Sequence, residues 1–561
     1  MTAADLLVQS LRQRGVEWIA TLCGHGLDPL LNAAREADLR LVDVRNEQTC
    51  AYMADACGRL TRRPGICAVS SGVADVNALA GVANASFDRA PLLLISGAGP
   101  TATAGKGHFQ DLDQVALARP ITKFSASIDN AEHTLRLLDE AFARAMADPR
   151  GPVHLMFPLD VQATELSGCD IGAVSSVVSD SATTESDLQD IARALTIAKA
   201  PLVIAGSGIF YNGSAFEMLR FCTDFHIPVV TPIWDRGAVD QPSRVFLGVV
   251  GAATGEPAVL SDADCILLAG AEIDYRIRYL QPPFVREDAR IFRIGADWNA
   301  LAARSGKRPA KQGAARENWL ATCVERRDDF RRAVEHRAEE QARRGLHAIH
   351  IIRAIQEVLL ENPVLLIDGG SIGQWAQQLL CRDRYPGDWL TCGRSGVVGW
   401  GIGGAMAARL AFSERPVILL SGDGAFTFNV ADLESAVRQS LPFVAIVADD
   451  QGWGITRLAH IREFGVPIAS SLGPIAFDRL ALSLGAHGVR VSTPGEIAHE
   501  LRKAIDKPVV TVIPCTHHWR QSLTLMNQVF TTQDVGLNCC LLRRAGSLDA
   551  GVFQRGRDWT P

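Results

Sequence analysis

The sequence predicts an α/β protein made of three doubly wound domains with mainly parallel sheets. Short apolar runs, such as residues 92–95, 364–367 and 417–420, end in Gly, Ser or Asp and alternate with segments of helical period along most of the chain. Continuous Val, Ile and Leu runs are typical of parallel strands that helices cover on both faces. Because strand and helix alternate, the strands are expected to form doubly wound layers.

Composition and charge are those of an ordinary cytoplasmic protein. The 561 residues are 47% hydrophobic and 21% charged, and this length suits three or four domains of typical size. The net charge of −6 gives no support to a nucleic-acid partner. The 13 cysteines include no CxxC pair, which favours reduced thiols. We find neither a signal-peptide pattern nor an apolar stretch of about 20 residues, and therefore expect no membrane partner.

Two interruptions of the strand–helix order divide the chain. Residues 167–187 are rich in Ser, Thr and Asp and are predicted to form a linker before a helix that begins at about Leu188. Residues 314–345 carry a charged helical pattern, which predicts a connecting helix on the surface. The predicted domains are therefore 1–165, 188–312 and 346–515, followed by a tail at 516–561.

A Gly-Asp-Gly triplet follows one of the predicted strands in the third domain. Residues 421–428 read SGDGAFTF and come directly after an apolar run. In open α/β sheets, ligands bind beyond the carboxyl ends of the strands. The glycines allow backbone N–H groups to approach an anion, and a helix expected to begin near Val430 offers its positive end. A carboxylate there would repel a phosphate unless a cation stood between them, so Asp423 is predicted to bind Mg²⁺ that bridges to a diphosphate.

A second acidic strand end follows in the sequence. Asp450 comes 27 residues (450 − 423) after Asp423, which is room for one helix and one strand, and it stands in Asp449-Asp450-Gln451-Gly452. This distance returns the chain to the neighbouring strand end, where two carboxylates suit a hard cation with octahedral coordination. Consecutive aspartates also cap turns, so a plain turn is the alternative.

The whole segment from residue 421 to 457 resembles that of thiamine diphosphate (ThDP) enzymes, in particular the branch of acetolactate synthase and benzaldehyde lyase. The resemblance extends over about residues 1–515. It implies pyrimidine-binding, central and diphosphate-binding domains, and Mg²⁺ held by Asp423, Asp450 and the carbonyl group of Gly452. In that branch an Asn usually stands where this chain has Asp450, so an oxygen ligand is kept and a negative charge is added.

The resemblance also implies an activating carboxylate in the N-terminal domain. Residues 41–47 are predicted to form a strand followed by a helix that begins at Glu47. In these enzymes such a Glu hydrogen-bonds the aminopyrimidine ring of a cofactor that another subunit holds. Taken alone, Glu47 would merely favour a helix N-terminus. Since Glu47 and Asp423 lie in different domains, the resemblance predicts a homodimer or homotetramer.

Glycine-rich turns supply the other cofactor contacts that the resemblance implies. Arg394-Ser-Gly-Val-Val-Gly-Trp-Gly401 is similar to the turn that holds the aminopyrimidine, and Val398 stands where an apolar side chain supports the bent cofactor. Asp368-Gly-Gly-Ser371 follows another strand and offers N–H groups to the diphosphate. The predicted cofactor-binding residues are Gly369, Ser371, Gly396, Val398, Gly422, Asp423, Gly424, Ala425, Asp450 and Gly452.

The substrate side is predicted from two further stretches. Ser71–Asn77, SGVADVN, stands where relatives carry SGPGxxN, and residues 107–110 stand where they carry a Phe-Gln pair. Gln110 is therefore the leading substrate-side polar residue. His25, in CGHG, and His108 are candidate acid–base groups, although a histidine can equally be structural.

The reaction favoured by the resemblance is decarboxylation and carboligation of 2-oxo acids, as in acetolactate synthase. A hydroxyketone or 2-hydroxyacyl-CoA lyase, acting on small hydroxyketones, aldehydes or thioesters, is the alternative enzyme. A non-catalytic regulatory or assembly subunit is the alternative of another class, which Glu47 and Asp423 disfavour. FAD is disfavoured as a further cofactor, because Glu272 replaces an arginine and Leu159 replaces a lysine of the acetolactate synthase pattern.

Overall fold

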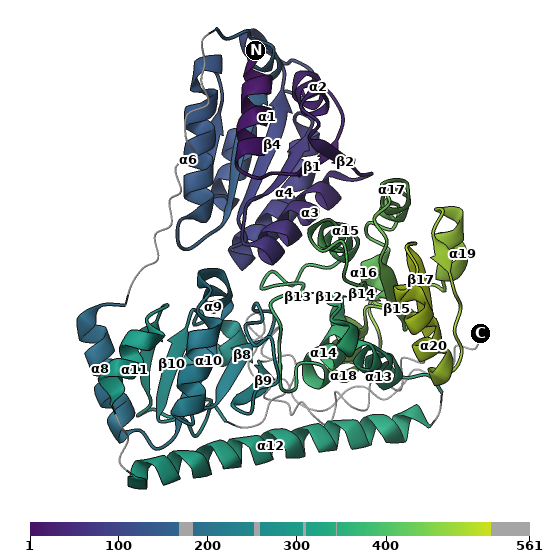
Figure 1. Ribbon diagram of the computed structural model, residues 1–561. Helices are drawn as coiled ribbons and strands as arrows, with labels where there is room; N and C mark the ends of the chain where they lie inside the picture. Colours follow the sequence, from purple (N-terminus) through teal and green to yellow (C-terminus); the bar gives the residue numbers. More distant parts are fainter. Residues whose placement is uncertain (168–182, 252–258, 307–309, 344, 518–561) are drawn as a thin grey trace, which may run out of the picture.

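Three parallel β-sheets, each covered by helices, form the molecule (Figure 1). The computed structural model describes residues 1–167, 183–251, 259–306, 310–343 and 345–517. The predicted α/β class with three doubly wound, parallel layers is confirmed. The predicted linker falls largely on residues 168–182 and the predicted tail on residues 518–561, and both ranges lie outside the described residues.

The N-terminal sheet has six parallel strands in the order β2-β1-β3-β4-β6-β5. Its central strand β3 is buried along its whole length, as the apolar run in the sequence predicts. Short 3₁₀ turns at Thr101–Thr103, Arg119–Ile121 and Ala131–His133 join some of the elements. The elements are α1 (Ala3–Gln13), β1 (Trp18–Leu22), α2 (Asp28–Glu36), β2 (Arg40–Asp43), α3 (Glu47–Thr61), β3 (Gly65–Val69), α4 (Val73–Asp88), β4 (Leu92–Ala98), α5 (Gln114–Ala118), β5 (Phe124–Ser127), α6 (Thr134–Met146), β6 (Pro152–Pro158) and α7 (Leu159–Gln162).

The central sheet has five parallel strands in the order β11-β10-β7-β8-β9. Its first helix begins after Thr184, whose side chain accepts a hydrogen bond from the N–H group of Asp187 and so caps the helix. The elements are α8 (Glu185–Ile197), β7 (Pro201–Ala205), α9 (Ser207–Asn212), α10 (Ala215–Asp224), β8 (Val229–Pro232), β9 (Phe246–Val250), β10 (Cys265–Ala269), a 3₁₀ stretch (Tyr275–Leu280), β11 (Arg290–Ile294) and α11 (Trp298–Ser305).

The C-terminal sheet has six parallel strands in the order β13-β12-β14-β15-β17-β16. Strands β12, β14 and β15 are almost wholly buried. The elements are α13 (Ala348–Glu357), a 3₁₀ turn (Leu359–Glu361), β12 (Val364–Asp368), α14 (Gly370–Leu379), β13 (Trp389–Thr391), α15 (Gly401–Ala411), β14 (Val417–Gly422), α16 (Asp423–Phe426), α17 (Asp432–Arg438), β15 (Val444–Asp449), α18 (Gly454–Phe464), α19 (Phe477–Ser483), β16 (His487–Gly488), α20 (Pro494–Ile505) and β17 (Thr511–Thr516).

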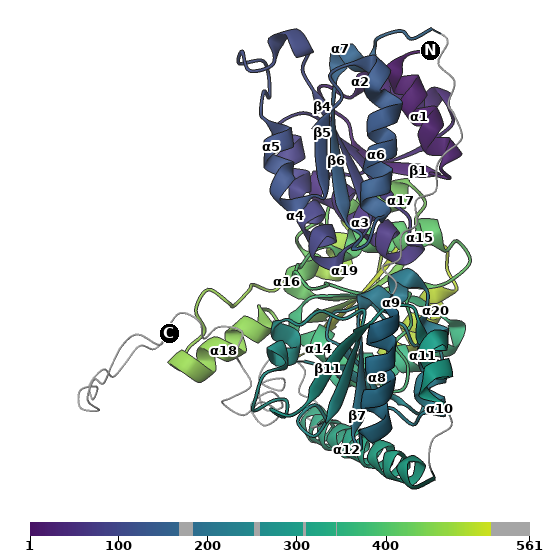
Figure 2. The same cartoon turned by 90° about the vertical axis from the view of Figure 1, so that its left-hand side faces the viewer.

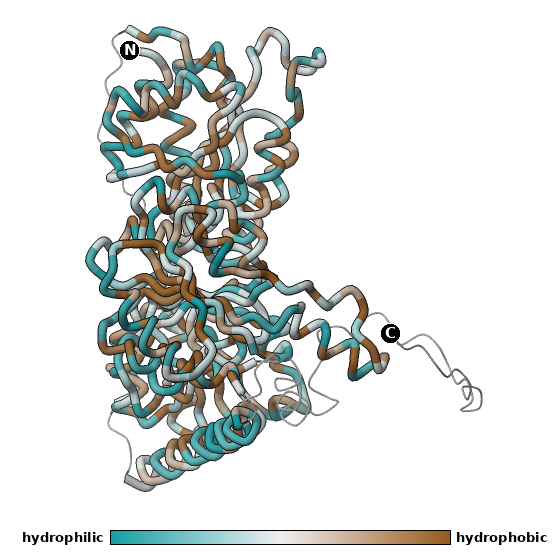
Figure 3. Tube along the Cα trace, turned by 90° about the vertical axis from the view of Figure 1, so that its right-hand side faces the viewer, coloured by the Kyte–Doolittle hydropathy of each residue, from teal (hydrophilic) through white to brown (hydrophobic). Residues whose placement is uncertain are grey.

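Helix α12 (Ala310–Ala342) connects the central and C-terminal domains and runs beneath both of them (Figure 1). It is largely hydrophilic (Figure 3), and it buries Leu320, Val334 and Ala338 against the two domains. The charged pattern of residues 314–345 is therefore a long surface helix with a narrow apolar side. No helix among the described residues is long and apolar enough to cross a membrane.

The N-terminal and C-terminal domains of one chain are joined by a buried polar seam where α3 packs on α15. The guanidinium group of Arg59 is fully buried, lies 3.3 Å from the Asp88 carboxylate, and donates to the carbonyl oxygen of Thr391 at 2.7 Å. Near α17, the hydroxyl group of Thr49 donates to Asp432 at 2.6 Å. Buried charges are retained only with such partners, so these contacts fix how the two domains sit in one chain.

Candidate active site

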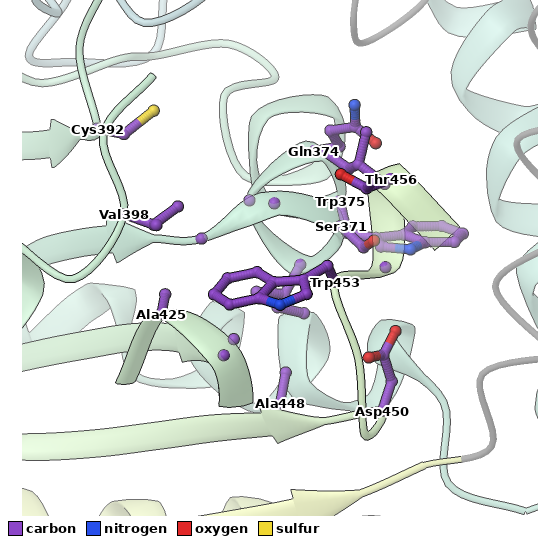
Figure 4. A pocket seen from close by; sticks show the side chains of 18 of the residues that line it. Ser371, Gln374, Trp375, Cys392, Val398, Ala425, Ala448, Asp450, Trp453 and Thr456 are labelled. Carbon is purple, nitrogen blue, oxygen red and sulfur yellow. The ribbon is translucent and has the colours of Figure 1, made fainter. Parts of the chain in front are cut away.

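A cavity of about 380 Å³ opens at the carboxyl ends of β12, β14 and β15 (Figure 4). Parallel pairing of β14 with β15 sets Gly422 opposite Ala448, so the residues that follow these two strands face one another. Every residue predicted to bind the cofactor lines this one cavity: Gly369, Ser371, Gly396, Val398, Gly422, Asp423, Gly424, Ala425, Asp450 and Gly452.

The first helical turn after β14 begins earlier than expected. The sequence suggested a helix that begins near Val430, whereas the four-residue α16 begins at Asp423 itself and α17 begins at Asp432. Strand β14 continues to Gly422, and the chain turns directly into α16. Asp423 therefore stands at the first position of a short helix, with its side chain at the cavity.

Two carboxylates lie buried at the floor of this cavity. Asp423 and Asp450 are 6% and 7% exposed. Oδ2 of Asp423 accepts a hydrogen bond from the N–H group of Gly452 at 3.0 Å. Burial and the neighbouring Asp450 carboxylate raise the pKa of Asp423 to about 7. Burial also raises the pKa of Asp450, against the opposing effect of the Arg457 guanidinium. The pair is arranged to accept a cation.

Ser371 and Gly454 form a tight cradle beside Asp450. The Ser371 hydroxyl oxygen is buried and has no hydrogen-bond partner among the described residues. A Cβ atom added at Gly454 would lie 2.3 Å from this oxygen and 2.8 Å from Oδ2 of Asp450. Gly454 thus allows Ser371 and Asp450 to approach its backbone closely, and the Ser371 hydroxyl group is an unused polar group at the lining of the cavity.

The turn that carries Gly396 and Val398 is held by the side chain of Asp368. The Asp368 carboxylate, at the end of β12, accepts hydrogen bonds from the N–H groups of Gly399 at 3.1 Å and Gly401 at 2.9 Å. The sequence predicted that the N–H groups of the Asp368–Ser371 stretch bind the diphosphate. The structure adds that the Asp368 carboxylate binds the backbone of the turn. These contacts keep Val398 on the wall of the cavity.

Trp453 and Trp234 line the cavity and Arg457 lies against Asp450, and none of the three was predicted from the sequence. The indole ring of Trp453 lies across the cavity between Val398 and Asp450 (Figure 4). Trp234 reaches the cavity from the central domain, far away in the sequence. Arg457, on the first turn of α18, contacts Asp450 at 3.0 Å. The extra negative charge of Asp450 was the one signal that could have led to this arginine.

A second group of predicted residues gathers at the carboxyl ends of the N-terminal strands. The side-chain N–H of Asn77 on α4 donates to Oε2 of Glu47 at 2.6 Å. The Ser71 hydroxyl group donates to Oε1 of Gln110 at 2.9 Å. The rings of His25 and His108 are stacked with their centroids 5.2 Å apart.

Neither Glu47, Gln110, His25 nor His108 lines the cavity of the C-terminal domain. The structure therefore places the predicted site residues in two separate groups within one chain. Nε2 of His25 is buried and lacks a hydrogen-bond partner among the described residues. No group of three or more His, Cys, Asp or Glu side chains that could hold a metal ion occurs in the described part of the chain.

Family comparisons match all three domains. The thiamine pyrophosphate enzymes' N-terminal TPP binding domain matches residues 1–117, their central domain matches residues 188–316, and their C-terminal TPP binding domain matches residues 368–515. The chain belongs to the thiamine pyrophosphate enzyme family. Thiamine pyrophosphate is another name for ThDP, so the predicted cofactor and family are confirmed, and the cavity with its glycine cradle fits that cofactor.

Curated relatives of this ThDP enzyme carry two different enzyme names. A probable acetolactate synthase of Mycobacterium bovis is 27% identical over 532 residues, which is 91% of this chain and 95% of the relative. The 2-hydroxyacyl-CoA lyase 2 of Bos taurus is 28% identical over 539 residues, which is 87% of this chain and 84% of the relative. A probable acetolactate synthase large subunit of Methanococcus aeolicus is 25% identical over 542 residues and 90% of each chain. These similarities place the chain in the acetolactate synthase-like branch.

Asp75, on α4 of the N-terminal domain, is a buried carboxyl group that makes the stability of the fold depend on pH. Asp75 is 0% exposed, and its two oxygens have no hydrogen-bond partner among the described residues. Nε2 of His154 lies 3.6 Å from Oδ1 of Asp75. Burial raises the pKa of Asp75 to about 7 and lowers the pKa of His154 to about 3. A carboxyl group with a raised pKa in the folded state stabilises the fold at low pH, and this contribution is lost as the pH rises from about 4 to about 7.

We therefore expect the stability of Asp75→Asn relative to the native protein to rise by about 2 kcal/mol between pH 5 and pH 8. His154 is present in both proteins, so the comparison isolates Asp75. Thermal unfolding of both proteins at the two pH values measures the effect. A stability difference that is the same at pH 5 and pH 8 would show that Asp75 does not titrate in this range.

The cradle at Gly454 gives a prediction for cofactor binding. Gly454→Ala places a methyl group on Ser371 and Asp450, so the affinity for ThDP in the presence of Mg²⁺ is expected to fall about tenfold or more. Gly473→Ala is the matched control, because a Cβ atom there would have no neighbour within 4 Å. Calorimetric titration of both variants tests the prediction, and equal affinities would contradict it.

Proposed function

We propose that this chain is a Mg²⁺- and ThDP-dependent enzyme that decarboxylates 2-oxo acids and joins the resulting acyl group to a second carbonyl compound. The observation that carries the proposal is the cavity at the ends of β12, β14 and β15, where all the predicted cofactor ligands converge. Similarity to acetolactate synthases over 91% and 90% of the chain supports this reaction class.

In this proposal the C-terminal domain holds the diphosphate end of the cofactor. Mg²⁺ prefers oxygen ligands and keeps part of its coordination for phosphate oxygens. Asp423, Asp450 and the carbonyl group of Gly452 would supply the protein oxygens. The unpartnered hydroxyl group of Ser371 and the backbone N–H groups at the start of α14 would serve the diphosphate.

Glu47 is the residue that we propose to exchange a proton with the aminopyrimidine ring. Bound ThDP supplies a carbon nucleophile for the substrate carbonyl and an electron sink for the bond that breaks. The 2.6 Å hydrogen bond from Asn77 fixes Oε2 of Glu47 and leaves Oε1 to face the ring. Glu47 begins α3 after the N-cap Asn46, so its position is set by the helix start.

We further propose a homodimer or homotetramer in which one chain's Glu47 faces another chain's cofactor. Glu47 lies outside the cavity of its own chain, which supports a site completed by a second copy. Large apolar side chains are exposed near both groups of site residues: Val73 is 62% exposed, Phe109 is 65% exposed and Phe428 is 52% exposed. Such exposure is expected at a surface that another chain covers.

Gln110 and the histidine pair would form the substrate side of the site. Gln110 is held by Ser71 and can donate its amide N–H to a carbonyl or carboxylate oxygen. His25 has an unused ring nitrogen and lies in stacking contact with His108, so either ring can take part in proton transfer.

FAD is left out of the proposal. Glu272, in the stretch GAEIDYR, forms an ion pair of 2.6 Å with Arg89 of the N-terminal domain. The position at which the acetolactate synthase pattern carries an arginine is thus occupied by a carboxylate that serves as an interdomain contact.

A 2-hydroxyacyl-CoA lyase is the second candidate, and a specific observation favours it. The lyase of Bos taurus is as similar to this chain as the acetolactate synthases are. Both reactions use the same ThDP site and differ in the substrate. A non-catalytic subunit is disfavoured, because such a subunit would not require the Glu47 carboxylate to be oriented by the 2.6 Å hydrogen bond from Asn77.

The experiment that tests the proposal incubates the protein, loaded with ThDP and Mg²⁺, with pyruvate, benzoylformate, benzoin and a 2-hydroxyacyl-CoA. We expect CO₂ release and hydroxyketone formation from a 2-oxo acid. Glu47→Gln should retain ThDP binding and lower turnover about 10²-fold or more, because a proton-transfer group is lost. Glu36→Gln, at an exposed position of α2, is the control.

Other outcomes would decide against the proposal. Carbon–carbon cleavage of the 2-hydroxyacyl-CoA to an aldehyde and a one-carbon acyl-CoA, without CO₂ release, would select the lyase. Unchanged turnover of Glu47→Gln would remove Glu47 from its role. No consumption of any acyl donor would favour a non-catalytic subunit.

A further inference from the structure

Arg457 binds the same carboxylate that is proposed to hold the metal ion. Its side chain is 4% exposed, and its Nη2 lies 3.0 Å from Oδ2 of Asp450. The same guanidinium group donates to the carbonyl oxygens of Asp450 and Gln451, each at 3.0 Å. It is therefore fixed by three acceptors on the turn that follows β15.

We propose that Arg457 is a positioning residue that neutralises Asp450 and holds one of its two oxygens, so that Asp450 offers a single oxygen to the cation as a neutral amide would. This inference rests on the proposed function, since it concerns the Mg²⁺ and ThDP of that site. It assigns Asp450 and Arg457 as one functional unit.

The charges of the site support this pairing. Asp423 and Asp450 are both buried, and both line the same cavity. Two uncompensated carboxylates would repel the diphosphate that the cation has to bridge. With the guanidinium group included, the formal charge of the three side chains is −1, which equals that of one aspartate beside a neutral ligand.

The geometry also leaves the correct oxygens available. Oδ2 of Asp423 is engaged by the N–H group of Gly452, and Oδ2 of Asp450 is engaged by Arg457. Each carboxylate therefore has one oxygen held by a donor and a second oxygen for a cation. Such orientation of a metal-binding carboxylate by a neighbouring donor is the usual way in which proteins tune a metal site.

Gly452 makes the approach of Arg457 possible. A Cβ atom at this position would lie 2.2 Å from Nη1 of Arg457. Any side chain at residue 452 would thus push the guanidinium group away from Asp450. Gly452, proposed above to bind Mg²⁺ through its carbonyl group, has a second role as the space that admits the arginine.

A purely structural role is the competing explanation. Arg457 could serve only to tie the turn of residues 450–452 to α18 through the two backbone carbonyl groups. The two explanations differ in what happens when Asp450 and Arg457 are both replaced, because only the charge-pairing role predicts recovery.

The test is a double-mutant cycle on full-length protein, with the dissociation constant of ThDP measured by calorimetry at saturating Mg²⁺. Asp450→Asn leaves a buried cation beside the metal, and Arg457→Met leaves an uncompensated carboxylate beside the diphosphate. Each is expected to weaken ThDP binding about tenfold or more. The double variant is expected to return to within about threefold of the native affinity. Arg490→Met, which removes an exposed arginine of the same domain, is the control.

Each result is decisive. Recovery in the double variant, with native-like circular dichroism for all proteins, supports the proposal. A double variant that binds as weakly as Arg457→Met overturns it in favour of the structural tie, and so does native affinity in Asp450→Asn alone. If the native protein takes up no ThDP, the proposed function fails together with this inference. If the native protein binds ThDP and the two effects are additive, this inference alone fails.

Discussion

The structure of this site depends on one electrostatic constraint: two carboxylates are buried at the ends of neighbouring parallel strands. Asp423 and Asp450 lie together because the register of β14 and β15 brings their carboxyl ends to the same place. Burial makes two negative charges unfavourable there. Burial and the neighbouring Asp450 carboxylate therefore raise the pKa of Asp423. In the proposed function, a divalent cation would offset this unfavourable burial, and a diphosphate would complete the coordination of the cation. The glycine cradle, Ser371 and Arg457 are all arranged around this pair.

The same architecture separates the two ends of the proposed catalytic site. The seam of Arg59, Asp88 and Thr391 fixes the N-terminal domain on the C-terminal domain of its own chain. In this arrangement Glu47 stands away from the cavity that its own chain forms. In the proposed assembly, a second chain brings its Glu47 to this cavity, so that one cofactor would contact both groups. Assembly is thus part of the proposed chemistry.

Much of this could be predicted from the sequence because the signals were local. Continuous apolar runs mark β3, β10 and β12, and Asp423 and Asp450 stand directly after such runs, where parallel strands bring their ends together. The family resemblance then supplied Glu47 and the turn around Val398. All of these positions follow from the order of strands along the chain.

What could not be predicted depends on contacts between distant or irregular segments. Trp234 reaches the cavity from another domain, and Trp453 occupies it from a loop whose path has no sequence signature. The guanidinium group of Arg457 approaches Asp450 through the space beside Gly452, a contact that depends on the path of the turn after β15. The buried pair Asp75 and His154 likewise comes from packing of α4 on β6.

The most direct test of the central claim is complementation between two inactive variants, Glu47→Gln and Asp423→Asn. Co-expressed with different tags, they should form hybrids in which one site has both native residues, so about a quarter of the native activity is expected for random dimers. If hybrids are isolated through both tags and show no more activity than either variant alone, Glu47 and Asp423 do not meet across two chains and the account is wrong.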